Sequence, residues 1–185
     1  MLNTHEFQQY IQSNTFLSAL DLPLNTQLEF SLLGQGEYNQ NFLFTHPVTQ
    51  QKLVLRINKG SQMHLENQIE YEFSALKDLE RSGRTPKALF YDNSKNILPY
   101  GILVMEWLPG RPLDYRKDLK KAAEIFADIH STPIPPNSQL IAPDFPCQAI
   151  FDECLQMVEH YFTWEQADPV IVSLLHELID EIRKL

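Results

Sequence analysis

The sequence has little of several features that define protein classes, and each shortage excludes one class. Only Cys147 and Cys154 are cysteines among 185 residues, and their spacing fits neither a zinc site nor a disulfide framework. The 15 basic and 24 acidic residues give a net charge of −9. This charge argues against a general nucleic-acid binder, because such proteins usually carry a positively charged surface. No apolar run approaches the roughly 20 residues of a membrane-spanning helix, and the N-terminus lacks the pattern of a signal peptide. We therefore expect a cytoplasmic protein that contacts neither nucleic acid nor membrane.

What the sequence does contain is the composition and periodicity of a globular α+β protein. Hydrophobic residues make up 43% of the chain and charged residues 21%, which is ordinary for a folded domain. Helical and alternating apolar periods predict helices at 4–12, 16–20, 64–81, 117–130, 148–162 and 169–184, and strands at 27–33, 41–45, 52–58, 88–91 and 100–107. This order indicates a five-stranded antiparallel sheet carrying one long helix, followed by a helical lobe.

The third predicted strand carries a cation, Arg56, on the face opposite its aliphatic residues. Val54 and Arg56 share this face, whereas the aliphatic residues between them take the other face and must pack in the core. An arginine here can fork onto phosphate oxygens while the valine lies against a flat base, although an ordinary surface arginine fits the same pattern. Glu72, in the middle of the long helix, is a candidate ion-pair partner, with Glu66 and Glu70 as competitors.

Two other segments are candidates for the same ligand. Gly34 and Gly36 lie in the predicted turn between the first two strands, where glycine lets a polyphosphate approach the backbone but is also common in plain hairpins. No Gly-Lys-Ser/Thr follows, so this turn is not a P-loop. The apolar strand that ends at Met105 and Glu106 can present main-chain polar groups to a base, or can simply be a buried central strand.

Taken in order, these segments resemble the N-terminal half of the aminoglycoside phosphotransferase and choline kinase-like family, which has the protein kinase fold. The segments that match, between about residues 27 and 136, are GQGEYNQNFLF, KLVLRIN, EFSALKDL before Pro86, LVMEWLPGRPL and AAEIFADIHSTPIP. The resemblance implies a protein kinase-like N-lobe at 26–108, preceded by N-terminal helices at 1–25 and followed at 109–185 by the hinge exit, a linker and an incomplete helical lobe.

The resemblance also implies an ATP site and assigns its residues. Gly34, Gly36 and Asn39 would cover the phosphates. Arg56 would take the place of the strand lysine of kinases, with Glu72 as its ion-pair partner. Behind and beside the base would lie Val54, Met105, the Glu106 carbonyl and the Leu108 N–H.

The catalytic part of the family pattern is missing from the sequence. Phosphoryl transfer in that family needs an Asp in a His-Gly-Asp type loop and a second Asp for Mg²⁺. None of the six histidines is followed two positions later by Asp. We therefore expect the ATP-binding part of a small-molecule kinase, inactive alone, with Mg²⁺ needed only by the complete enzyme. The net charge of −9 is compatible with an amine-bearing acceptor.

Two rival hypotheses remain open from the sequence. One is a naturally short, non-catalytic domain for nucleotide sensing or protein interaction, and the other is an α+β domain with no nucleotide site. Because the chain ends inside a predicted helix, before the expected catalytic loop, we expect either a shortened gene or a piece of a longer enzyme. The apolar residues of that helix would need cover, so we expect a homodimer through exposed helices. These residues are Leu174, Leu175, Leu178, Ile179 and Ile182.

Overall fold

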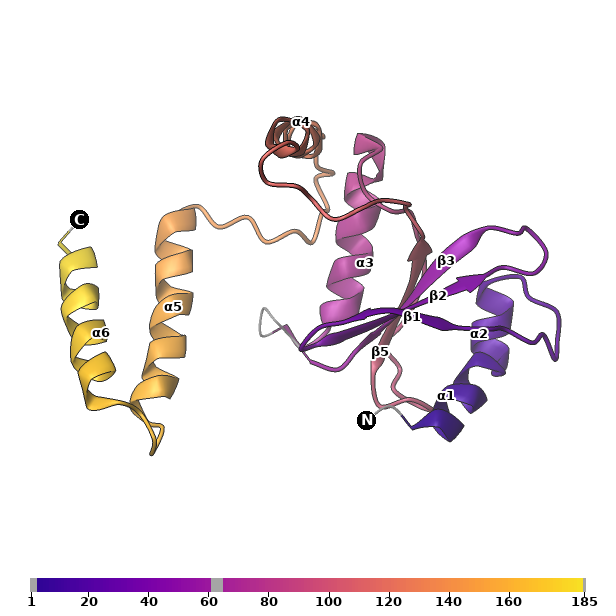
Figure 1. Cartoon of the computed structure of the whole chain (residues 1–185), viewed down its shortest axis with the longest axis horizontal. Helices are drawn as coiled ribbons and strands as arrows, with labels where there is room; N and C mark the ends of the chain where they lie inside the picture. The colour runs from indigo at the N-terminus through magenta and orange to yellow at the C-terminus, as the bar shows by residue number, and fades with distance from the viewer. Residues whose placement is uncertain (1–2, 61–64, 185) are drawn as a thin grey trace. The chain divides into compact units, whose positions relative to one another are not determined.

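The computed structural model describes residues 3–60 and 65–184, which fall into two compact units. The first unit, Met1–Leu140, contains the sheet, and the second unit, Ile141–Leu185, contains a pair of helices (Figure 1). In the described ranges, no helix combines the length and the apolar character needed to cross a membrane.

Two short helices begin the chain because a capping residue starts each one. The Asn3 side chain accepts hydrogen bonds from the first turn of α1 (Thr4–Ile11), and Ser13 does the same for α2 (Asn14–Ala19). Their apolar residues are buried against the sheet. Helices this short need such packing to be stable.

The five strands form one antiparallel sheet in the order β1-β2-β3-β5-β4, which confirms the predicted fold class. Their bounds are β1 Ser31–Gln35, β2 Asn39–Thr45, β3 Lys52–Asn58, β4 Ala88–Asp92 and β5 Gly101–Glu106. The prediction was wrong for β1, which begins later than residue 27 and includes Gly34 and Gln35. These two residues pair with Asn41 and Gln40 beyond a bulge after Leu32, so the ladder continues where the sequence predicts a turn.

Helices cover both faces of this sheet, and the alternation in β3 separates the two layers. Leu55 and Ile57 lie in the core beneath α1 and α2, whereas Val54 lies with Ile69 of α3 (Gln68–Leu79). Figure 1 shows α3 and the α1–α2 pair on opposite sides of the strands. Because both faces are buried, β3 and β5 are the near-continuous apolar runs seen in the sequence.

The long helix ends where the sequence predicts. After Leu79 a 3₁₀ turn, η1 (Glu80–Ser82), leads to Gly83, whose φ of 64° is the left-handed conformation that glycine adopts at helix ends. At its start, residues 65–67 are not helical, so α3 is shorter than predicted. The predicted first residue, His64, lies outside the described residues.

His46, which lies between the second and third predicted strands, is a buried link between β2 and α2. Its Nε2 lies 2.8 Å from the Leu20 carbonyl oxygen, and its Nδ1 accepts from the N–H groups of Val48 and Thr49 at 3.3 and 3.2 Å. Since Nδ1 accepts, the ring proton sits on Nε2 and is donated to Leu20. One side chain thus closes the β2–β3 turn and holds it to the end of α2.

The three remaining helices have apolar faces that the described residues do not bury. They are α4 (Leu119–His130) in the first unit and α5 (Pro146–Phe162) and α6 (Pro169–Ile182) in the second, and none of them contains a buried residue. Leu174 and Leu178 of α6 are exposed, and Leu175 and Ile179 are half-buried. The homodimer that the sequence suggests for this face stays a prediction.

Candidate functional site

An ion pair joins the central strand β3 to α3. Arg56 Nη1 lies 2.6 Å from Glu72 Oε2, and the two side chains are 27% and 17% exposed. The pair forms because α3 covers the face of β3 that carries Arg56. Of the competing glutamates, Glu70 instead accepts a weaker contact of 3.4 Å from the Tyr91 hydroxyl. The pairing implied by the family resemblance is therefore present, and its role toward a ligand stays a prediction.

Two uncharged side chains that the sequence did not single out complete this pair. Asn41 Oδ1 accepts from Arg56 Nε at 3.0 Å, and Gln68 Nε2 donates to Glu72 Oε1 at 3.1 Å. Both had a signal that could have been read. Asn41 alternates onto the same face of its strand as Asn39, and Gln68 precedes Glu72 by one helical turn.

The glycine-bearing hairpin lies beside this cluster. Gly34 pairs with Asn41, and Asn41 pairs with Arg56, so the three residues form a row across β1, β2 and β3. At the tip, the Gly36 N–H donates to the Asn39 carbonyl at 2.8 Å. The Asn39 side chain accepts from Asn58 Nδ2 at 2.9 Å, so it is directed to the end of β3.

Neither hairpin glycine is required by the fold. A Cβ added at Gly34 or Gly36 meets no described atom within 4 Å, and neither residue has a positive φ. Two other glycines differ: a Cβ at Gly101 would lie 2.6 Å from Ile69 Cγ1, and one at Gly60 would lie 2.8 Å from the Tyr38 ring. The open space at positions 34 and 36 is what a ligand approaching the backbone would use.

At the end of β5, a buried apolar residue is followed by an exposed segment. Met105 pairs with Val54 across the β3–β5 register, and both are buried on the α3 face of the sheet. The Glu106 carboxylate accepts from the Lys87 N–H at 3.3 Å, which fixes the start of β4. Leu108 follows and is 48% exposed. Val54 links the two parts of the site, because it lies beside Met105 and two residues from Arg56.

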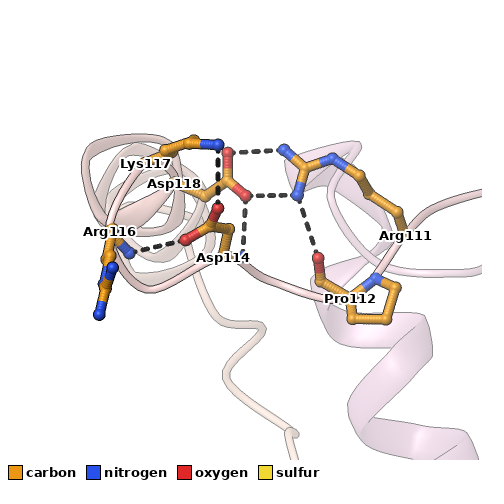
Figure 2. A network of polar contacts seen from close by, with 6 residues as sticks. All are labelled: Arg111, Pro112, Asp114, Arg116, Lys117 and Asp118. Carbon is orange, nitrogen blue, oxygen red and sulfur yellow. Dashed lines mark hydrogen bonds and ion pairs between the residues drawn. The ribbon is translucent and has the colours of Figure 1, made fainter.

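The segment after β5 is closed by a second ion pair, which sequence reasoning missed. Arg111 donates from Nη1 and Nη2 to the two carboxylate oxygens of Asp118, at 2.6 and 2.8 Å, and the Asp114 N–H donates to the same carboxylate at 3.0 Å (Figure 2). The hydrogen bonds from Arg111 and from the Asp114 backbone lower the pKa of Asp118 to about 2. The loop is thereby fixed to the start of α4. No periodic pattern relates two charges seven residues apart in a loop, so the sequence carried no signal for this pair.

The site thus offers a half-buried cation and open backbone, which suit an anion, next to the buried apolar pair Val54 and Met105. Within residues 3–60 and 65–184, no three His, Cys, Asp or Glu side chains gather to hold a metal ion. The residues that the structure brings together are Gly34, Val54, Arg56, Glu72 and Met105, with Asn41 and Gln68 added. Gly36, Asn39, Glu106 and Leu108 lie at the two ends of this arrangement.

Comparison with known proteins adds one positive finding. The model of a family described as "Phosphotransferase enzyme family" matches residues 29–168, a range that includes the hairpin, the Arg56–Glu72 pair, β5 and α4. No curated protein matches the chain, and no solved structure does.

Proposed function

The chain belongs to the phosphotransferase enzyme family, and from this premise we propose that it is the ATP-binding part of a small-molecule kinase. The complete enzyme would move the γ-phosphoryl group of ATP to a hydroxyl of a small acceptor, and the net charge of −9 suits an acceptor that bears an amine. The observation that carries this proposal is the Arg56–Glu72 pair, whose Arg56 lies in one row with Asn41 and Gly34 of the hairpin.

The proposed contacts with ATP follow from the donors and surfaces of the site. A guanidinium has five N–H donors, and within the described residues Asn41 and Glu72 use two of those on Arg56, so three are available there for phosphate oxygens. Such charge-assisted contacts are stronger than neutral hydrogen bonds. The open backbone at Gly34 and Gly36 would let the phosphates approach the hairpin, beside Asn39. Val54 and Met105 would lie against the adenine, and the Glu106 carbonyl and Leu108 N–H would hold its edge.

We propose further that this polypeptide alone transfers no phosphoryl group. Catalysis of that reaction consists largely of positioning and electrostatics, supplied in this family by an Asp loop and metal ligands. No histidine of the sequence begins a His-x-Asp, and among the described residues no three His, Cys, Asp or Glu side chains gather to hold a metal ion. Mg²⁺-dependent phosphorylation of any acceptor by the 185-residue chain would overturn this proposal.

The missing His-x-Asp also favours a second candidate, a non-catalytic domain that senses a nucleotide or binds another protein. A nucleotide-sensing domain would have the same proposed ATP site as the kinase. A His-Gly-Asp loop encoded downstream of Leu185 would decide for the kinase, whereas its absence from the reading frame would decide for the sensor.

The first experiment measures ATP binding through the fluorescence of Trp107, which directly follows β5. Trp164→Phe removes the only other tryptophan, and adenosine serves as the ligand without phosphates. We expect saturable ATP binding, weakened roughly 10- to 150-fold by Arg56→Gln, from the 1.5–3 kcal/mol typical of hydrogen bonds to charged groups. Adenosine affinity should not change.

The matched control is Arg84→Gln, because Arg84 also pairs with a carboxylate, that of Asp128, at 2.7 Å, and its hydrogen bonds within the described residues are to Ser82 and Asp128. It should bind ATP as the unsubstituted chain does. Absence of binding at millimolar ATP would overturn the proposed function. Equal ATP affinity with and without Arg56 would remove Arg56 from the site.

A further inference from the structure

The Arg56–Glu72 pair is held at both of its outer ends by neutral side chains. Asn41 binds Arg56 through Nε, whereas Glu72 binds it through Nη1. On the other partner, Gln68 binds Oε1 of Glu72, whereas Arg56 binds Oε2. Each charged group is therefore fixed at two separate atoms, while Arg56 Nη2 makes no hydrogen bond to any part of the chain that the structure describes.

We propose that Asn41 and Gln68 are positioning residues that orient the Arg56 guanidinium toward a polyphosphate. This inference rests on the proposed function, because it concerns the same site. A planar guanidinium held by one contact can swing about it, whereas contacts at Nε and Nη1 set its plane. Gln68 acts on Arg56 indirectly, through Glu72. Because Gln68 and Arg56 each bind one oxygen of the Glu72 carboxylate, that carboxylate keeps its orientation. Neither residue is a catalytic residue.

The position of Asn41 supports this role. It lies opposite Arg56 in the β2–β3 register and opposite Gly34 in the β1–β2 register, between the cation and the open hairpin. The atom of Asn41 that accepts from Arg56, Oδ1, is also uncharged. Glu72 already balances the charge of Arg56, so a second carboxylate at position 41 would leave the cluster net negative and repel phosphate. An amide oxygen holds the arginine without that effect.

The test compares affinities for ATP and for adenosine in Asn41→Leu and Gln68→Leu. Each substitution removes a hydrogen bond that orients Arg56 but does not touch the ligand, so it should weaken ATP roughly three- to tenfold, less than the loss of Arg56 itself, and leave adenosine binding unchanged. Asn41→Asp keeps the acceptor but adds a negative charge, so it should also weaken ATP while the melting temperature is kept. Thr45→Val, an exposed position on the same strand, is the control and should change neither affinity.

A double-mutant cycle decides whether Asn41 acts through Arg56. In an Arg56→Gln background, Asn41→Leu should have no further effect on ATP affinity. An undiminished effect there, or equal losses for ATP and adenosine, would overturn the inference.

An effect of Arg56→Gln without any effect of Asn41→Leu and Gln68→Leu would overturn it while leaving the proposed function intact. If Arg56→Gln itself changes nothing, Arg56 has no role and the inference falls with it. Should Asn41→Leu not fold, Gln68→Leu, which lies outside the sheet, carries the same test.

Discussion

Replacing the hairpin glycines should change stability and ligand binding in opposite directions. At Gly34 and Gly36 a methyl group meets no described atom within 4 Å, and neither φ is positive. Alanine there should raise the free energy of unfolding by about 0.4–1 kcal/mol, because it reduces the entropy of the unfolded chain. The same methyl group would occupy the space through which phosphates reach the backbone. Losing one hydrogen bond between the hairpin backbone and a phosphate should weaken ATP binding by about tenfold or more.

Gly101→Ala gives the contrasting case for the same assay. Its Cβ would lie 2.6 Å from Cγ1 and 3.0 Å from Cβ of Ile69, which is itself buried and cannot move away freely. Overpacking of this kind should lower the free energy of unfolding by about 1–3 kcal/mol. Urea unfolding gives the stabilities, and Trp107 fluorescence gives the ATP affinities.

The outcomes separate two explanations of the hairpin glycines. If Gly34→Ala and Gly36→Ala are stabilised and still bind ATP normally, the glycines do not serve the approach of phosphates, and the proposed use of the hairpin is wrong. If both variants are destabilised like Gly101→Ala, the fold needs these glycines after all, and the inference from open space fails.

Two further predictions concern polar groups that hold the fold. Since the pKa of Asp118 is lowered from 3.8 to about 2 by Arg111 and backbone hydrogen bonds, the stability that it contributes is present above about pH 4 and lost as the pH falls toward 2. Arg111→Gln should flatten this acid-side loss in urea unfolding measured between about pH 5 and 2, and an unchanged slope would contradict the assignment. His46→Leu should lower the free energy of unfolding by about 2 kcal/mol or more, because it leaves the Leu20 carbonyl and two N–H groups without their partner. A change no larger than that of the exposed His5→Leu would contradict this account.

The elements that packing determines were predictable from the sequence, and those that depend on single polar contacts were not. The alternation around Arg56 gave β3 its bounds and its two faces, because both faces are buried and the pattern is strong. The start of β1 was missed because Leu28 and Phe30 alternate like a strand yet pack against the core without entering the ladder.

In the candidate site, too, some residues could be predicted from the sequence and others could not. Glu72 could be proposed from its place on the helix and from the family resemblance, and the pair is present. Asn41 and His46 were overlooked. Alternation places Asn41 on the face of Asn39, but the contacts that an amide or imidazole makes depend on which side chains tertiary packing brings within about 3 Å. The nucleotide-binding roles of the named residues stay predictions.

The place of Arg56 in β3 has a consequence for how the sheet assembles. In a strand, a slip of one residue exchanges the two faces. Such a slip would move Arg56 to the layer that now holds Leu55 and Ile57 beneath α1 and α2, away from Glu72 and Asn41. Burying a guanidinium without a partner is very unfavourable, so the misaligned sheet would be penalised by the residue that we propose binds phosphate. A chain that pairs its central strands wrongly would therefore lose the ligand site and its stability together, and only the correctly aligned sheet would persist to bind a nucleotide.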